Sequence, residues 1–209
     1  YMAFAAANLK TALAAIRLNT GLYLLSFGTV VMLNAWVFLW SLAFVGVFYM
    51  DMKKDQVPCS DLGLTDDELY PPGKMCDQTP NLLQIFGLML CLYWTQQVIQ
   101  NVLHCTTAGT IGSWWFSPLG QQGAFCGFSR PLSDAFYRSI TYSFGSICFG
   151  SLLVAILQAL EQMAKSQRSR RGGNVVTCVI QCVIYCLRGY LEYFNSWAFC
   201  YVGLYGYDY

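Results

Sequence analysis

Residues 18–50 read LNTGLYLLSFGTVVMLNAWVFLWSLAFVGVFYM, a run of 33 residues without Asp, Glu, Lys or Arg. A hydrocarbon core of about 30 Å is crossed by about 20 helical residues, so this stretch can span a bilayer as a tilted helix or with its ends outside the core. It is much too long for the apolar core of a cleavable signal peptide. The pattern predicts a transmembrane helix.

The composition of the whole chain indicates the same environment. Of the 209 residues, 56% are hydrophobic and 11% are charged, whereas about one quarter of a soluble domain is charged. A soluble fold needs charge to cover its surface, so this shortage indicates a surface that faces lipid. The formal net charge of +1 argues against a nucleic-acid partner, which would require clustered Lys and Arg. We therefore expect an integral membrane protein whose first partner is the lipid bilayer.

Gaps between charged residues divide the chain into further segments. They predict an all-α, polytopic transmembrane helix bundle with about four membrane segments, within a single transmembrane domain over residues 1–209. The segments are an interfacial helix at 1–17, a span at 18–50, an acidic outer loop at 51–80, a span at 81–116, a Gly-rich loop at 117–138, a span at 139–160, a basic loop at 161–173, and a segment at 174–207.

Two parts of this topology stay open. Segment 174–207 is either a span or a broken or re-entrant helix, because Arg188 and Glu192 interrupt it. If every segment crosses once, the basic loop lies on the same outer side as the acidic loop, against the positive-inside tendency. The acidic loop also contains Cys59 and Cys76, which are candidates for a disulfide on the non-cytoplasmic side or else two free thiols.

Polar side chains recur at helical spacing within segment 81–116. Trp94, Gln97, Asn101 and His104 fall on one stripe of a helix. Amides that face hydrocarbon are unfavourable, so the stripe must face other helices or a water-filled cavity. One interpretation is a substrate pathway lined by amides and one histidine, which could bind a proton. The other is hydrogen bonding between helices, worth around 1 kcal/mol per contact; the two are compatible.

The remaining candidates give weaker indications. Trp114 and Trp115 belong either to an interfacial aromatic belt or to the wall of a site for an organic cation. The cysteines at 178, 182 and 186 share one helix face, but a zinc site would need a further ligand. The sequence carries no nucleophile elbow, no phosphate-binding loop with a lysine and no His-x-Glu metal motif. We therefore expect no enzyme activity, no cofactor and no metal site.

Three stretches carry a resemblance to a known family. They are YWTQQVIQNVLHCTTAGTIGSWWF at 93–116, SITYSFGSICFGSLLVA at 139–155 and EYFNSWAFCYVGLYG at 192–206. Together they resemble the choline transporter-like family, also called solute carrier family 44, and within it the fungal branch of pH-nine-sensitive proteins. The motifs are long and collinear, and the resemblance covers most of residues 80–207.

The resemblance implies an α-helical fold of roughly ten spans, of which this chain looks like a middle-to-late part. Its start at Tyr1, without an initiator Met, fits that expectation. Family members move choline, and some move ethanolamine, as facilitated or proton-linked carriers. The resemblance therefore implies a membrane transporter for choline or a related small organic cation, in the plasma membrane or alternatively in an organelle membrane.

The motif positions supply the candidate substrate-binding residues. With Gln97 added from the stripe, these are Trp94, Gln97, Asn101, His104, Trp114, Trp115, Tyr142, Glu192 and Asn195. The alternative function is a structural or accessory subunit of a larger membrane complex without transport activity. In that case the polar stripe and the small-residue faces would pack against partner membrane chains.

Overall fold

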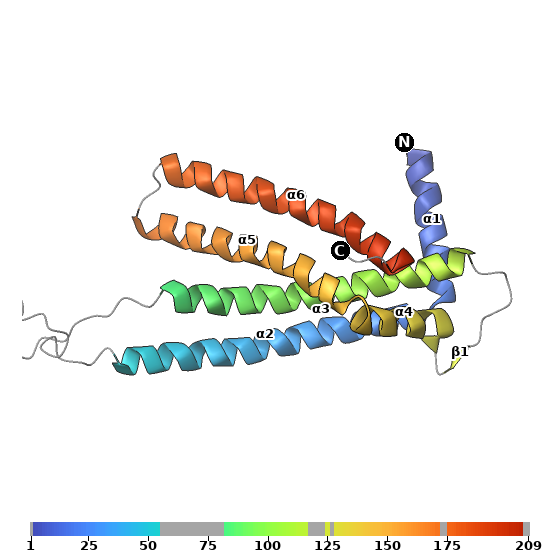
Figure 1. The fold of residues 1–209 in the computed structure, drawn as a ribbon, viewed down its shortest axis with the longest axis horizontal. Coiled ribbons are helices and arrows are strands. Elements are labelled where there is room, and N and C mark those ends of the chain that lie inside the picture. Colours follow the sequence, from blue (N-terminus) through green and yellow to red (C-terminus); the bar gives the residue numbers. More distant parts are fainter. Residues whose placement is uncertain (1, 55–81, 117–123, 126–127, 172–174, 207–209) are drawn as a thin grey trace, which may run out of the picture.

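The computed structural model describes residues 2–54, 82–116, 124–125, 128–171 and 175–206 (Figure 1). These residues form six helices and one pair of two-residue antiparallel strands. The elements are α1 Met2–Leu18, α2 Gly21–Lys54, α3 Leu82–Phe116, β1 Ala124–Phe125, β2 Phe128–Ser129, α4 Arg130–Thr141, α5 Phe144–Arg171 and α6 Val175–Tyr205. The predicted helical bundle is confirmed, and the small hairpin is its one departure from an all-α chain within the described residues.

Helix α3 is the centre of the bundle. It contacts α2, α4, α5 and α6 along its length, while α5 and α6 also pack against each other. Figure 1 shows these long helices side by side, with the short α4 lying against the C-terminal part of α3 and with α1 turned away from the bundle. The helix predicted to carry the polar stripe is therefore the one that most other helices touch.

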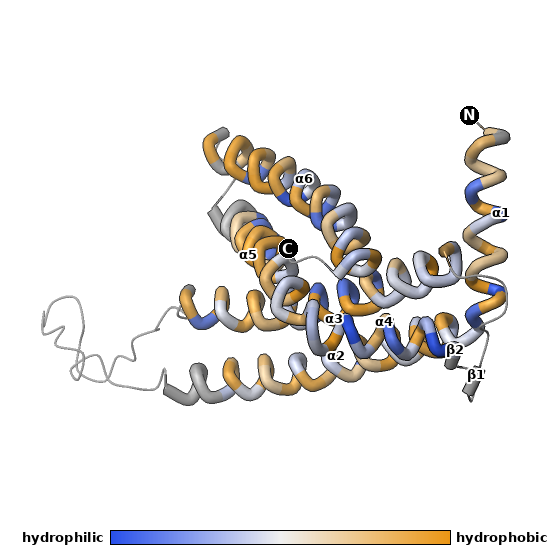
Figure 2. Tube along the Cα trace, turned by 45° about the vertical axis from the view of Figure 1, so that its right-hand side comes forward, coloured by the Kyte–Doolittle hydropathy of each residue, from blue (hydrophilic) through white to orange (hydrophobic). Residues whose placement is uncertain are grey.

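Helix α2 is held by few side chains and exposes most of its apolar ones. Its contact with α3 includes a hydrogen bond from the Trp40 indole N–H to the Leu88 carbonyl at 2.9 Å. Large side chains such as Phe27, Phe38 and Val45 are exposed, and the helix is coloured mainly as hydrophobic in Figure 2. This surface fits contact with acyl chains, which need no hydrogen bonds from the protein.

Two helical segments are long and apolar enough to cross a membrane by length and composition, namely Gly21–Tyr49 and Phe144–Ser166. Helices α3 and α6 are equally long, but they carry amides, a histidine and the charged pair Arg188 and Glu192. These polar groups lower the mean hydropathy of both helices. The predicted count of four membrane segments therefore stays a prediction.

A buried asparagine forms the corner between α1 and α2. The Asn19 amide donates to the Ala15 carbonyl at 3.0 Å, and its oxygen accepts a bond from the Ser129 hydroxyl at 2.9 Å. Ser129 is the residue that precedes α4. One side chain therefore joins the α1–α2 corner to the start of α4. Helix α1 agrees with the helix expected at 1–17, and its position at a membrane surface stays a prediction.

The structure differs from the segment predicted as a Gly-rich loop at 117–138. Residues from Arg130 onward form α4, which Pro131 starts in its first turn. Proline is favourable there because its missing N–H has no partner to lose. Leu132, Ala135 and Ser139 are buried on one face of α4, and this face packs against α3. Figure 2 shows hydrophilic residues gathered around α4, so a search for apolar runs overlooks it.

The limits predicted for the third span also need correction. The span expected at 139–160 is interrupted at Tyr142 and Ser143, whose N–H groups both bond to the Arg138 carbonyl. Helix α5 starts at Phe144 and continues to Arg171, through residues predicted as the basic loop 161–173. Lys and Arg are good helix formers, so a run of positive charge does not end a helix. For residues 174–207 the structure excludes the broken helix, because α6 is continuous from Val175 to Tyr205. That this helix crosses the membrane stays a prediction.

Candidate functional site

The inner face of α6 is built from residues spaced alternately four and three apart. Arg188, Glu192, Asn195, Phe199 and Val202 follow this spacing, which keeps side chains on one side of a helix. Phe199 and Val202 are buried in the apolar cluster with Ile147 and Cys105. Along α6 this face is first charged, at Arg188 and Glu192, then carries the amide of Asn195, and ends with the apolar Phe199 and Val202. It forms the seam between α6, α5 and α3.

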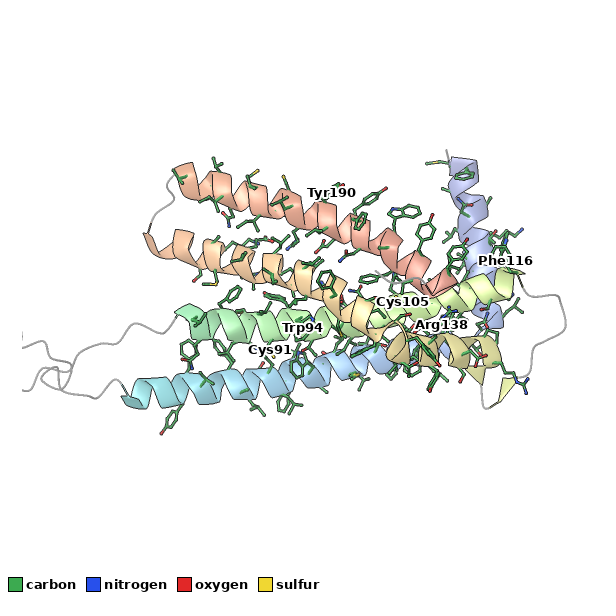
Figure 3. All side chains as sticks on the ribbon, viewed as in Figure 1. Cys91, Trp94, Cys105, Phe116, Arg138 and Tyr190 are labelled. Carbon is green, nitrogen blue, oxygen red and sulfur yellow. The ribbon has the colours of Figure 1, made fainter. Side chains whose placement is uncertain are left out.

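The other side of α6 is exposed and aromatic. Tyr190, Tyr193, Trp197 and Tyr201 all lie largely open, and Tyr190 is labelled in Figure 3. Tyr193 and Trp197 pack edge to face with ring centroids 6.3 Å apart. The two sides of α6 therefore differ in chemistry, and the polar groups lie on the side that meets α5 and α3.

Two members of the polar stripe on α3 bond to α5. The Asn101 amide donates to the Ser151 hydroxyl at 2.8 Å. The Trp94 indole N–H donates to the Cys148 carbonyl at 3.0 Å, and Trp94 keeps part of its ring exposed. Gln97, between them in sequence, is half-buried. The expectation that the amides at this depth turn toward other helices holds for Asn101.

His104 and Asn195 connect the same helices through α6. The His104 Nε2 atom lies 3.2 Å from the Ser196 carbonyl and 3.4 Å from the Cys200 sulfur. The Asn195 amide is buried and donates to the Gly150 carbonyl at 2.9 Å. The imidazole therefore lies between α3 and α6, and the Asn195 amide lies between α6 and α5. Polar side chains of α3 therefore contact both α5 and α6, and one of α6 contacts α5.

A group of charged residues continues the seam between α5 and α6. Glu161 is only 2% exposed, and its two carboxylate oxygens lie 2.5 Å from Lys165 Nζ and 2.6 Å from Arg188 Nη1. Arg188 Nε lies 3.4 Å from Glu192 Oε1. Arg188 therefore pairs with Glu192 on its own helix and with Glu161 on α5. A buried carboxylate needs such partners to remain charged.

Backbones approach closely where α6 crosses α3. A Cβ added to Gly203 would lie 2.5 Å from the Cys105 carbonyl, and one added to Gly109 would lie 2.8 Å from the Gly203 carbonyl. The Arg138 guanidinium, from α4, donates to that same Gly203 carbonyl. Figure 3 labels Cys105 and Arg138 in this region. The close approach of α3 and α6 therefore depends on Gly109 and Gly203. Arg138 of α4 contacts both helices' meeting point through its bond to Gly203.

Three of the predicted site residues, all aromatic, lie away from the seam between α3, α5 and α6. Trp114 and Trp115 form an edge-to-face pair at the C-terminal end of α3, about 15 Å along the helix from His104 at 1.5 Å per residue. Trp115 is 62% exposed. Tyr142 lies at the junction of α4 and α5, is 79% exposed and packs against Tyr137. These positions suit an aromatic belt better than a site shared with His104.

Two further expectations concern cysteines and metals. Cys59 and Cys76 lie outside the described residues. Among the residues that the structure describes, no group of three or more His, Cys, Asp or Glu side chains is placed to hold a metal ion.

Comparison with known proteins places the chain in a family. The sequence model of a family described as plasma-membrane choline transporter matches residues 2–209. The chain belongs to the plasma-membrane choline transporter family. It is therefore a membrane protein with transmembrane helices, and membership in a transporter family suggests a role other than catalysis.

Fungal proteins are among the relatives of this chain. Protein PNS1 of Saccharomyces cerevisiae is 33% identical over 97% of this chain and 37% of its own length. Protein PNS1 of Gibberella zeae is 32% identical over 97% of this chain and 36% of its own length. The resemblance to the fungal branch is confirmed. The chain spans little more than a third of these relatives, and no solved structure matches it.

Several residues in this choline transporter family chain were not singled out from the sequence. Some are direct partners of the predicted residues, namely Cys148, Gly150, Ser151, Gln158, Ser196 and Cys200. The others belong to neighbouring contacts of the same bundle, and they are Arg138, Gly203 and Glu161. One signal could have found Glu161. Positions 147, 151, 154, 158, 161 and 165 continue the four-and-three spacing along α5, which indicates that the helix does not end before the charged residues.

Proposed function

We propose that the full-length protein carries choline or a related small organic cation across a membrane, and that α3, α5 and α6 line part of the path. The family match supports transport, and the chemistry of the seam supports a cation. The plasma membrane is the proposed location, with an organelle membrane as the alternative.

The observation that carries this proposal is the partly exposed carboxylate of Glu192. Its side chain is 42% exposed, although it lies on a helix whose neighbouring positions are largely apolar. Ionisable groups within membrane helices are unfavourable and generally serve substrates or ions. A carboxylate attracts an organic ammonium ion, and aromatic rings bind its poorly hydrated surface. The exposed part of the Trp94 ring, on α3 where it contacts α5, supplies such a surface.

Polar groups along the seam would complete the binding region. Asn101, His104 and Asn195 place two amides and an imidazole between α3, α5 and α6. In this proposal Gln97 belongs with them, while Trp114, Trp115 and Tyr142 serve at the entrance to the path. The aromatic side chains at those positions can hold a cation as it leaves bulk water.

A structural or accessory role is the second candidate. It is favoured by the direct hydrogen bonds from Trp94 and Asn195 to main-chain carbonyls of α5, since such bonds hold helices together without any substrate. In that role the full-length protein would move no solute, and its exposed helix faces would bind partner chains.

Uptake into liposomes that contain the purified full-length protein distinguishes the two functions. Labelled choline is expected to enter with saturable kinetics and to compete with ethanolamine. Glu192→Gln should raise KM by about fivefold, as expected for the loss of a partly exposed charge interaction. Asp134→Asn, which removes an exposed carboxylate on α4, is the matched control and should leave KM unchanged. Absence of saturable flux for every organic cation tested would favour the accessory role.

A further inference from the structure

The four charges between α5 and α6 do not form two equal pairs. Both oxygens of Glu161 are occupied, by Lys165 at 2.5 Å and by Arg188 at 2.6 Å. Among the residues that the structure describes, Arg188 at 3.4 Å and Gln158 at 3.3 Å both contact the same oxygen of Glu192, Oε1. Arg188 is therefore shared between two carboxylates and lies much nearer to Glu161.

Burial strengthens this difference. The Glu161 side chain is 3% exposed, whereas that of Glu192 is 42% exposed. An ion pair is screened less when it is buried, so the attraction between Arg188 and Glu161 exceeds that between Arg188 and Glu192. The half-exposed carboxylate is left loosely paired.

Without Glu161, Arg188 would have one carboxylate within reach. Arg188 and Glu192 are four residues apart on α6, a spacing that brings side chains together on a helix. A guanidinium and a carboxylate can then form two parallel hydrogen bonds. That pairing would neutralise Glu192 and compete with any incoming cation.

We propose that Glu161 is a positioning residue, which holds Arg188 away from Glu192 and so keeps the Glu192 carboxylate available to the organic cation. This inference rests on the proposed function, in which Glu192 attracts the substrate. The charges support it as well. Lys165 and Arg188 balance Glu161 and Glu192, and removing the Glu161 charge would leave an excess positive charge that repels a cation.

Uptake kinetics of labelled choline into liposomes with the full-length protein test this role. Glu161→Gln is expected to raise KM about fivefold, the effect of one partly exposed ion pair. The double variant Glu161→Gln with Arg188→Gln is expected to return KM to within about twofold of the wild type, because the competing guanidinium is gone and the charges balance again. Lys165→Gln leaves Arg188 on Glu161 and removes a positive charge, so it is the control in which KM should not rise.

The kinetic parameter that changes separates positioning from a structural role. If Glu161 only held α5 against α6, its loss would lower the fraction of active protein, and therefore the maximal rate, while KM stayed constant. A double variant as impaired as the single one, or a fall in maximal rate at constant KM, would overturn the inference.

A second measurement is independent of transport. The coupling between Arg188 and Glu192 is obtained from thermal unfolding of the purified full-length protein, using the variants Arg188→Gln, Glu192→Gln and both together. In the Glu161→Gln background this coupling, measured as a shift in Tm, should be at least twice that in the wild-type background. An unchanged coupling contradicts the role of Glu161. Increased coupling in a protein that moves no cation contradicts only the proposed transport function.

Discussion

Asn101 illustrates how much one polar side chain can contribute within a membrane helix. Its amide bonds to the hydroxyl of Ser151, which is itself fully buried. A buried hydroxyl that loses its partner keeps its desolvation penalty without the compensating bond. The sequence predicted that Asn101 would turn toward another helix, because an amide in hydrocarbon is unfavourable. It could not predict Ser151 as the partner, since that depends on how α3 and α5 are aligned.

Replacing Asn101 by Ala is expected to destabilise the full-length protein by about 1 kcal/mol, the typical value for a hydrogen bond between membrane helices. Thermal unfolding in detergent measures this. Gln100→Ala changes an exposed amide one position away on α3 and should have little effect. The double variant Asn101→Ala with Ser151→Ala should be no less stable than the worse single variant. Additive losses would show that the two side chains act independently.

His104 is expected to help hold α6 against α3. The ring lies against the Ser196 carbonyl and the Cys200 sulfur between α3 and α6. A hydrogen bond between membrane helices is worth about 1 kcal/mol. His104→Ala should therefore destabilise the full-length protein by about that amount, whereas His104→Gln, which keeps hydrogen-bonding capacity, should destabilise it less. Thermal unfolding in detergent measures this, and equal losses in the two variants would show that the hydrogen bond does not contribute.

At the scale of elements, the crossing of α3 and α6 depends on glycine. A Cβ at Gly203 would lie 2.5 Å from a main-chain oxygen of α3, and backbone atoms cannot move aside as a flexible side chain can. The stretch at residues 192–206 carried part of the family resemblance and contains Gly203. The role of Gly203 in packing was not predicted. Only the position of α3 reveals it.

Gly203→Ala should therefore destabilise the full-length protein by about 1–3 kcal/mol, as overpacking does. Gly189→Ala, on the same helix with nothing within 4 Å of the added Cβ, is the matched control. It should be neutral or slightly stabilising because Ala favours helix. Thermal unfolding provides the comparison, and equal behaviour of the two variants would show that the helices do not meet at Gly203.

Other elements show what a sequence can and cannot specify. The limits of α3 at Leu82 and Phe116 were predicted, since a long uncharged stretch with helical periodicity allows few alternatives. Helix α4 was missed because its buried face consists only of Leu132, Ala135 and Ser139, which is too short an apolar pattern to indicate a helix. The end of α5 was missed because charge was taken as the end of a span, although charged residues extend a helix readily.

At the scale of the whole molecule, two connections share one end of the bundle. Helix α2 ends and α3 begins there, and so do the C-terminal end of α5 and the N-terminal end of α6 (Figure 1). Residues 51–77 carry seven acids and three lysines, whereas residues 165–171 carry only positive charges. Crossing of the membrane by these helices would therefore place the basic residues 165–171 on the same side as the acidic residues 51–77. This is the departure from the positive-inside tendency that the sequence predicted.

Epitope tags inserted into the full-length protein test this arrangement. Tags after Ser60 and after Gly173 should be reached by antibody from the same side of sealed vesicles. A tag after Gly120, between α3 and α4, should be reached only from the opposite side, because α3 runs from one end of the bundle to the other. Tags at 60 and 173 on opposite sides would contradict the antiparallel order of α2, α3, α5 and α6.

The glycine contact between α3 and α6 has a mechanical consequence. Gly203 is fixed against α3 by main-chain atoms, whereas Val175 lies 28 residues away along α6, a lever arm of about 42 Å at 1.5 Å per residue. If α6 tilts as a rigid rod about this pivot, its crossing with α3 barely shifts. A tilt of about 5° displaces the distant tip by nearly 4 Å over that length, so small rotations are amplified where α6 begins.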